Sequence, residues 1–338
     1  MNKRIRFTSL LLAIVLVLSM TLLAGCGKDS KEDVVVTIND EEIYLSEAMY
    51  YIYSVEANFG MMLGSDYWDT VVEDERTFGE LTKEYVMDGL VEMHIMSEEG
   101  TKAGLEIDSQ LETQLKTSAV DFYNSMTDQL KEITGLTERS IYNIIHKNYI
   151  AALHKNEILA DLDIDIEAIE AEYNREEYRQ YNTQYLHIPF VTTDDDNNEV
   201  ELTDAEKTEA KATLEKALSD VQSGKTFAEI AEEYEDIKSS SANFLPGDEY
   251  TVSVAYQNIA MELENDEVTE EIVETEDGYY IIMMVDNDSA AYYNAVINDA
   301  ANQKQQELYL EKYEEIKEEY TVTINDEVWD PIKVGRTT

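Results

Sequence analysis

The stretch that decides the fold runs from residue 184 to residue 286 and has three parts. It begins with Gln184-Tyr-Leu-His-Ile-Pro-Phe190, in which polar and apolar residues alternate as they do in a strand. Its middle, Gly224-Lys-Thr-Phe-Ala-Glu-Ile-Ala-Glu-Glu-Tyr-Glu-Asp236, opens with a capping box and predicts a short helix. Its end, Val268-Thr-Glu-Glu-Ile-Val-Glu-Thr-Glu-Asp-Gly-Tyr-Tyr-Ile-Ile-Met-Met-Val285, predicts a buried strand behind a turn at Asp277-Gly278. A strand, helices and a closing hairpin predict a small α+β domain with its own core.

The length and composition of the chain limit its domain number, its secondary structure and its possible functions. A chain of 338 residues has room for roughly two domains, and 43% hydrophobic residues are enough for packed cores. Only three prolines and thirteen glycines leave helix as the main secondary structure outside the stretch. The net charge of −48 excludes binding to nucleic acid through neutralisation of phosphates. No nucleotide-binding or hydrolase motif is present, and the four histidines lack metal-ligand spacing, so neither a cofactor nor a metal is expected.

The first 25 residues have the shape of a secretory signal. Lys3, Arg4 and Arg6 precede an apolar run from Leu10 to Leu23, which is too short for an ordinary membrane span. The run ends in Leu23-Ala-Gly-Cys26, which resembles a bacterial lipobox, in which the cysteine receives a diacylglyceryl group before cleavage. An uncleaved anchor helix with an incidental cysteine is the alternative.

The expected mature protein is therefore attached to the cell membrane through a lipid, on its extracytoplasmic face. Residues 1–25 would be the signal peptide, and residues 26–33 the lipidated Cys26 and a polar tether. Cys26 is the only cysteine, so the chain contains no internal disulfide.

A block of helices is predicted on either side of the central stretch. The periodicity predicts helices over about 47–59, 78–102, 109–133 and from 137 onward, and a long charged helix over 289–320. Val36-Thr-Ile-Asn-Asp-Glu41 recurs as Val322-Thr-Ile-Asn-Asp-Glu327. We expect these two segments, each a strand followed by a turn, to pair in one small sheet. Chance use of a common turn-forming sequence is the alternative. Met and Tyr residues in the first helices are read mostly as core, with some lining a groove for unfolded chains.

The order of the central stretch resembles the parvulin-type peptidyl-prolyl isomerase domain. A mostly helical block ahead of such a domain resembles the chaperone domain of extracytoplasmic foldases of the PrsA and SurA kind. The resemblance implies an α+β protein whose SurA-like helical chaperone domain is formed by both chain ends, residues 34–180 and 287–338. The parvulin-like α/β domain, residues 181–286, would be inserted between them.

Site residues follow from the same resemblance. Parvulins use one histidine in the first strand, where this chain has His187, and one in the closing strand, where it has Tyr280. Asp236, just past the Phe-Ala-x-x-Ala helix, matches the acidic or thiol position. The substrate pocket would be formed by Val252, Tyr256 and Met261. For His187, a purely structural role with ring nitrogens satisfied by backbone is the alternative.

The expected function is a folding factor that binds unfolded secreted polypeptides and their proline-containing segments, with weakened isomerase activity. Isomerisation requires a barrier of roughly 18–20 kcal/mol to be lowered, and a site can do this by binding the twisted amide without a nucleophile or metal. The first alternative is a non-catalytic holdase, and the second is a structural or solute-binding lipoprotein. Assembly into a homodimer is left open.

Overall fold

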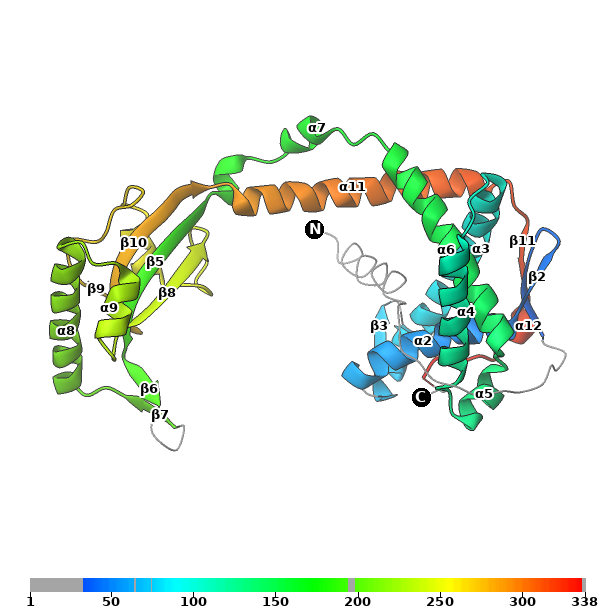
Figure 1. Cartoon of the computed structure of the whole chain (residues 1–338), viewed down its shortest axis with the longest axis horizontal. Helices are drawn as coiled ribbons and strands as arrows, with labels where there is room; N and C mark the ends of the chain where they lie inside the picture. Colours follow the sequence, from blue (N-terminus) through cyan, green and yellow to red (C-terminus); the bar gives the residue numbers. More distant parts are fainter. Residues whose placement is uncertain (1–32, 64, 74, 194–197, 336–338) are drawn as a thin grey trace. The chain divides into compact units, whose positions relative to one another are not determined.

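The computed structural model describes residues 33–63, 65–73, 75–193 and 198–335. The signal segment 1–25, Cys26 and all of the tether except Asp33 lie outside the described residues. The described chain forms two compact units (Figure 1). The first unit contains the residues up to Asp163 and those from Gln305 onward, and the second contains Ile164–Lys304. The second unit is therefore inserted into the sequence of the first.

A three-stranded sheet joins the two chain ends within the first unit. Its strands are β1 (Val34–Ile38), β2 (Glu41–Tyr44) and β11 (Val322–Ile324), in the order β11-β1-β2. The antiparallel register pairs Val36 with Ile324 and Ile38 with Val322. The strands of the two repeated segments thus pair in one sheet, as predicted.

Helices make up the rest of the first unit. They are α2 (Leu45–Leu63), α3 (Phe78–Lys102), α4 (Ser109–Tyr123), α5 (Asp128–Thr134), α6 (Glu138–Asp161), the second half of α11 (Ala291–Lys317) and α12 (Asp326–Trp329). A 3-10 turn η1 (Ser65–Asp69) and a short hairpin of β3 (Val71–Glu73) and β4 (Arg76–Thr77) connect α2 to α3.

The prediction of one helix over 109–133 was wrong. The helix α4 ends at Tyr123, whose ring is buried, and a new helix starts at Asp128. The Thr127 side chain accepts a hydrogen bond from the Leu130 N–H at 3.2 Å. A threonine that caps in this way competes with continuation of the preceding helix, so the chain turns here.

The core of the first unit lies where α2, α3 and α6 meet the sheet. The side chains of Ile52, Leu90, Ile95 and Met96 have at most 1% of their surface exposed. Each such side chain contributes about 1.5–3 kcal/mol through burial. The C-terminal segment takes part in the same core through Tyr309, Tyr313, Trp329 and Val334. Both chain ends are therefore needed to complete this unit.

The second unit is built on a four-stranded antiparallel sheet in the order β8-β5-β10-β9. Its strands are β5 (Gln180–Pro189), β8 (Lys238–Phe244), β9 (Val273–Glu274) and β10 (Gly278–Ser289). The helical elements are α7 (Ile166–Glu170), the 3-10 turn η2 (Arg175–Tyr178), α8 (Asp204–Gln222), α9 (Phe227–Glu233) and α10 (Val254–Ala260). A further hairpin consists of β6 (Val191–Thr193) and β7 (Glu199–Glu201).

Each face of this sheet packs against different helices, because side chains alternate along a strand. Leu186, Ile188 and Ile281 pack in one cluster with residues of α8 and α9. Figure 1 shows these two helices on one side of the sheet. The intervening residues of β10, Tyr280 and Ile282, point to the other face and pack with Tyr256 and Ala260 of α10. This second face carries the predicted site residues His187 and Tyr280.

No helix among the described residues combines the length and the apolar composition needed to cross a membrane.

Candidate active site

His187 and Tyr280 are direct neighbours on adjacent strands. The antiparallel register of β5 and β10 pairs them, and their rings stack with centroids 4.4 Å apart and an interplanar angle of 16°. Directly opposed residues in an antiparallel sheet project to the same face, so the register fixes this contact. The tyrosine at the second-histidine position thus contacts the first histidine directly.

Other aromatic rings surround this stacked pair. The Tyr280 ring lies edge-on to Tyr185 at 5.4 Å and to Tyr256 at 5.3 Å, and Tyr185 lies edge-on to Tyr256 at 5.8 Å. Val252 and Met261 are partly buried against the same cluster. Edge-to-face rings at such distances attract one another beyond their area burial. The structure therefore gathers five of the six predicted catalytic and substrate-binding residues at one place.

The places of Tyr256, Val252 and Met261 differ in accessibility. Tyr256 is only 1% exposed, and its hydroxyl is hydrogen-bonded to Thr183 at 2.8 Å. A ring this buried forms the floor of the site and does not offer a surface to a substrate in this conformation. Val252 and Met261 are half-buried, so their side chains are more accessible than that of Tyr256.

Asp277 is a site residue that sequence reasoning missed, because it was read only as part of a turn. Its Oδ2 accepts a hydrogen bond from the Tyr280 hydroxyl at 2.5 Å, and its Oδ1 accepts one from the Thr275 hydroxyl at 2.5 Å. Burial alone would raise the pKa of Asp277, but these two hydrogen bonds outweigh it and lower that pKa. The sequence signal that could have found Asp277 is its position three residues before Tyr280, at the turn that precedes the strand.

The environment of His187 favours the neutral imidazole. Burial lowers the pKa of His187; the negative charge of Asp277 opposes this effect and the positive charge of Lys238 adds to it. The Nε2 atom is buried and has no hydrogen-bond partner among the described residues. A buried polar atom left unpaired costs about 1–3 kcal/mol, so a histidine held only for structure is expected to be paired on both nitrogens. The purely structural reading of His187 is weakened.

Gly278 makes room for the imidazole. A Cβ atom at this position would lie 2.6 Å from the Ile188 carbonyl oxygen and 2.8 Å from the His187 Nε2. Only glycine allows the strand β10 to pass so close to the histidine ring.

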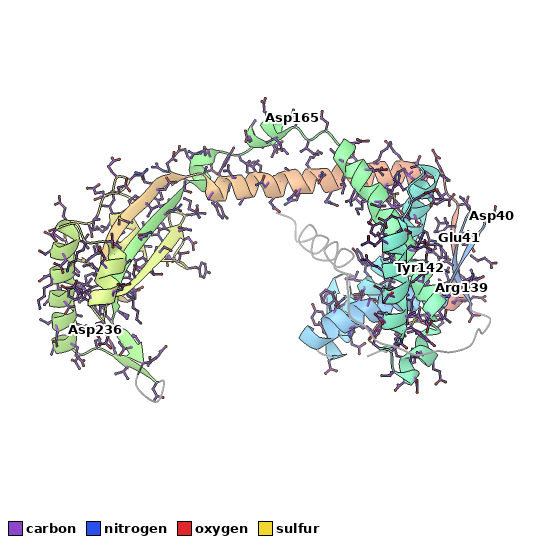
Figure 2. All side chains as sticks on the ribbon, viewed as in Figure 1. Asp40, Glu41, Arg139, Tyr142, Asp165 and Asp236 are labelled. Atoms are coloured by element: carbon purple, nitrogen blue, oxygen red, sulfur yellow. The ribbon has the colours of Figure 1, made fainter. Side chains whose placement is uncertain are left out.

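Asp236 is not brought to the stacked pair. It is exposed in the connection between α9 and β8, where Figure 2 labels it. The charges that shift the pKa of His187 are those of Asp277 and Lys238, and Asp236 is not among them. In this structure Asp277 supplies the carboxylate at the stacked pair.

A buried glutamine, also missed from the sequence, fixes the loop that carries Val252. Gln257 is 1% exposed, and its Oε1 accepts from the Gly247 N–H at 2.8 Å. Its Nε2 donates to the carbonyl oxygens of Asp248 and Val252 at 2.8 and 2.9 Å. Three hydrogen bonds from one side chain therefore hold the segment from Gly247 to Val252 in place.

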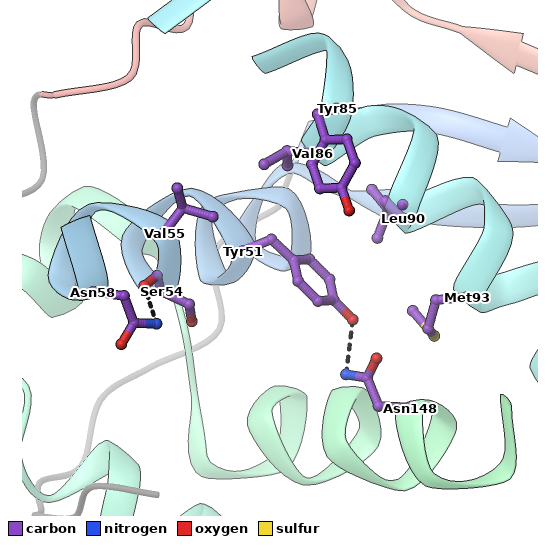
Figure 3. Close-up of a pocket in the computed structure, with 10 residues that line it drawn as sticks. Tyr51, Ser54, Val55, Asn58, Tyr85, Val86, Leu90, Met93 and Asn148 are labelled. Carbon is purple, nitrogen blue, oxygen red and sulfur yellow. Dashed lines mark hydrogen bonds between the residues drawn. The ribbon is translucent and has the colours of Figure 1, made fainter. Parts of the chain in front are cut away.

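The first unit contains a small cavity, shown in Figure 3. It lies between α2, α3 and α6, holds about 40 Å³, and is lined among others by Tyr51, Leu90 and Met93. Asn148 donates a hydrogen bond to the Tyr51 hydroxyl at 2.8 Å. This volume suits a few water-sized groups and no stretch of polypeptide. Met87, Met93 and Met96 are buried, which places these methionines in the core rather than in a client groove.

No cluster of His, Cys, Asp or Glu in the described part of the chain is arranged to hold a metal ion.

Comparison with known proteins gives matches to the domain that carries this site and to the chain as a whole. Residues 187–286 match the family described as Rotamase, PPIC-type PPIASE domain. The "Foldase protein PrsA" of Halalkalibacterium halodurans is 27% identical over 280 residues, which cover 79% of this chain and 70% of that protein. Residues 187–286 therefore match a PPIC-type rotamase domain, and the chain as a whole is similar to a PrsA foldase. The matched region begins at the stacked histidine His187 and ends just before β10 does.

Solved structures give more distant likenesses. PrsA from Bacillus subtilis is 13% identical with a TM-score of 0.24, and the match covers 86% of this chain and 93% of that one. The foldase protein PrsA from Lactococcus lactis is 14% identical with a TM-score of 0.30, covering 88% and 96%. A SurA-like chaperone from Campylobacter jejuni is 9% identical with a TM-score of 0.31, covering 86% and 98%. Such low scores add nothing to the family assignment, which rests on the sequence comparisons.

Proposed function

We propose that this chain is an extracytoplasmic folding factor that binds unfolded secreted polypeptides and isomerises their X-Pro bonds. The observation that carries the proposal is the stacked pair of His187 and Tyr280 inside a domain that matches the PPIC-type rotamase family. The relative named as a foldase supports the same function for the chain as a whole.

The site has the properties that amide rotation requires. Burial raises the pKa of Tyr280 far above its ordinary value and lowers that of His187, so both groups are neutral near pH 7. A twisted prolyl amide has lost its resonance, and it is bound better than the planar form by an apolar, weakly solvated surface with neutral polar groups. Tyr185, which packs on the buried Tyr256, supplies an aromatic surface for the ring, and Val252 and Met261 supply its rim.

A holdase without catalysis is the second candidate, and one observation favours it. Tyr280 is 5% exposed, and its only proton is donated to Asp277. Since that phenol cannot offer an exchangeable donor as an imidazole does, the domain would then bind proline-containing segments without accelerating their isomerisation.

The deciding experiment uses residues 27–338 and NMR exchange on a short X-Pro peptide. Acceleration that disappears in His187→Ala but persists in His146→Ala, a control on α6 of the other unit, supports an isomerase. No acceleration, with suppression of client aggregation retained, supports the holdase. Loss of both activities would contradict a folding factor.

We further propose that Cys26 carries the lipid that attaches the mature chain to the membrane. The lipobox-like ending of the apolar run supports this assignment. Cys26→Ala should release the protein into the medium and abolish incorporation of labelled fatty acid. Sedimentation of residues 27–338 over a range of concentrations tests the homodimer.

A further inference from the structure

We propose that Asp277 is a positioning residue of the isomerase site, which orients the Tyr280 hydroxyl and with it the ring that stacks on His187. This inference rests on the proposed function for its meaning in catalysis, but its geometry can be tested without any turnover. In this arrangement, Tyr280 held by Asp277 takes the place of the second histidine that parvulins have.

The carboxylate of Asp277 is held from two sides. Thr275, which is 7% exposed, donates to Oδ1, and Tyr280, which is 5% exposed, donates to Oδ2. Hydrogen bonds to a carboxylate are shorter and roughly twice as strong as those between neutral groups. Two of them fix both oxygens, so the acceptor that Tyr280 faces has one orientation.

This arrangement sets the polarity of the Tyr280 hydroxyl. A phenol has one proton, and here it is donated to Asp277, so the lone pairs of the oxygen are what a bound chain can meet. Tyr280 therefore presents an acceptor that suits a backbone N–H beside the proline. A histidine at this position would offer a donor or an acceptor according to its tautomer.

The same carboxylate reaches His187 through its charge. The charged and titratable groups around this imidazole are Asp277 of the turn before β10, Lys238 of β8, Tyr280 of β10 and Tyr185 of its own strand. Asp277 is the group among them that favours the protonated ring, whereas Lys238 and burial oppose it. Removal of the Asp277 charge must therefore shift the titration of His187 downward.

The test compares Asp277→Asn, which keeps the shape, with Glu276→Gln, which removes the neighbouring exposed charge and leaves the hydrogen bonds to Asp277 intact. In residues 27–338, the NMR titration midpoint of His187 should fall in Asp277→Asn by on the order of half a pH unit, less than for a fully buried pair. It should stay in place in Glu276→Gln. The hydroxyl proton of Tyr280, visible in the parent protein through its short hydrogen bond, should move upfield or vanish only in Asp277→Asn.

The isomerisation rate supplies the second readout. Asp277→Asn should slow it roughly tenfold, as expected when one charge-assisted hydrogen bond in a site is weakened. In a Tyr280→Phe background, the same change should have no further effect, because the hydroxyl that it positions is gone. An unchanged His187 titration together with an unchanged Tyr280 hydroxyl signal in Asp277→Asn would overturn the inference. If the parent protein has no isomerase activity, the proposed function fails, while the two NMR signals still decide on Asp277.

Discussion

At the scale of single residues, the candidate site depends on how closely a few side chains approach one another. The imidazole of His187 stacks on the ring of Tyr280 and lies close to the backbone of Gly278. Asp277, in the turn before β10, accepts a hydrogen bond from the Tyr280 hydroxyl. Each contact has a consequence that a single substitution measures.

Gly278→Ala should destabilise the parvulin-type domain by roughly 1–3 kcal/mol, because its Cβ would overlap the Ile188 carbonyl and the His187 ring. Chemical denaturation followed by the signals of this domain measures the loss. Gly100→Ala, which is also crowded but lies in the first unit, is the control and should leave these signals unaffected. A stability equal to that of the parent would show that the close approach at Gly278 does not exist.

The lowered pKa of His187 makes a prediction about pH. Because the folded pKa lies below the unfolded value of about 6.5, the neutral ring stabilises the domain above that value, and this contribution is lost as the pH falls through the folded pKa. The protection factors of the β5 and β10 amides, which correct the exchange rates for their intrinsic pH dependence, should therefore fall below about pH 6. In His187→Gln this part of the pH dependence should be absent, and its persistence would assign it to other groups.

At the scale of elements, one ion-pair network joins four segments of the first unit. His94 on α3 is buried, and its Nε2 donates to Glu47 Oε1 of α2 at 2.8 Å. Its Nδ1 lies 3.5 Å from Glu41 Oε2 of β2 and 3.1 Å from Lys147 Nζ of α6, and Lys147 also pairs with Glu41. Burial lowers the pKa of His94, but the hydrogen bonds to Glu41 and Glu47 outweigh it, so the net shift is upward.

The pH dependence of stability that His94 gives the first unit therefore runs opposite to the one that His187 gives the second unit. A raised folded pKa means that protonated His94 contributes stability that is fully present below the unfolded pKa and is lost as the pH rises through the folded pKa. The protection factors of the α3 amides, which correct the exchange rates for their intrinsic pH dependence, should therefore fall as the pH rises from about 6.5. His94→Gln should remove this trend, and the control His146→Gln should retain it. The same trend in both variants would exclude His94 as its source.

A second element-scale prediction concerns the C-terminal helix α12. Trp329 is 6% exposed and belongs to the core that β1 and α3 complete, so Trp329→Ala should cost about 3–5 kcal/mol of the unfolding free energy of the first unit. Ile324 of the adjoining strand β11 is 40% exposed, and Ile324→Ala should cost less than about 1 kcal/mol. Denaturant midpoints measure both. Equal losses would mean that the chain end does not complete this core.

At the scale of the whole molecule, the net charge of −48 determines which clients approach fastest. A strongly negative surface attracts unfolded chains with excess lysine and arginine and repels acidic ones. Association with a cationic unfolded polypeptide should be faster than with an acidic one of equal length, and this difference should shrink between roughly 20 and 300 mM salt. Stopped-flow fluorescence measures both rates. Rates that do not respond to salt would show that apolar contacts alone select the client.

The sequence by itself determined the parts of this protein that rest on local chemistry. The capping box at Thr226 starts helix α9 as predicted, since the side-chain and backbone groups that it joins are only three residues apart. The alternation of polar and apolar residues in β5 and β10 and the repeated segment near the two chain ends also predicted strands correctly. The strand period and the turn chemistry are local properties of the sequence. The parvulin-type fold and the site positions of His187 and Tyr280 were implied by the resemblance of the central stretch to a known family.

Only the tertiary structure decided which groups meet. The Asp277–Tyr280 hydrogen bond depends on the direction of two side chains across a turn, and the exposed place of Asp236 depends on how the chain leaves α9. The network around His94 joins residues that are 47 and 53 positions apart from it, a separation at which sequence periodicity carries no information. Packing and register set such contacts, because they fix distances between elements that the local sequence leaves free.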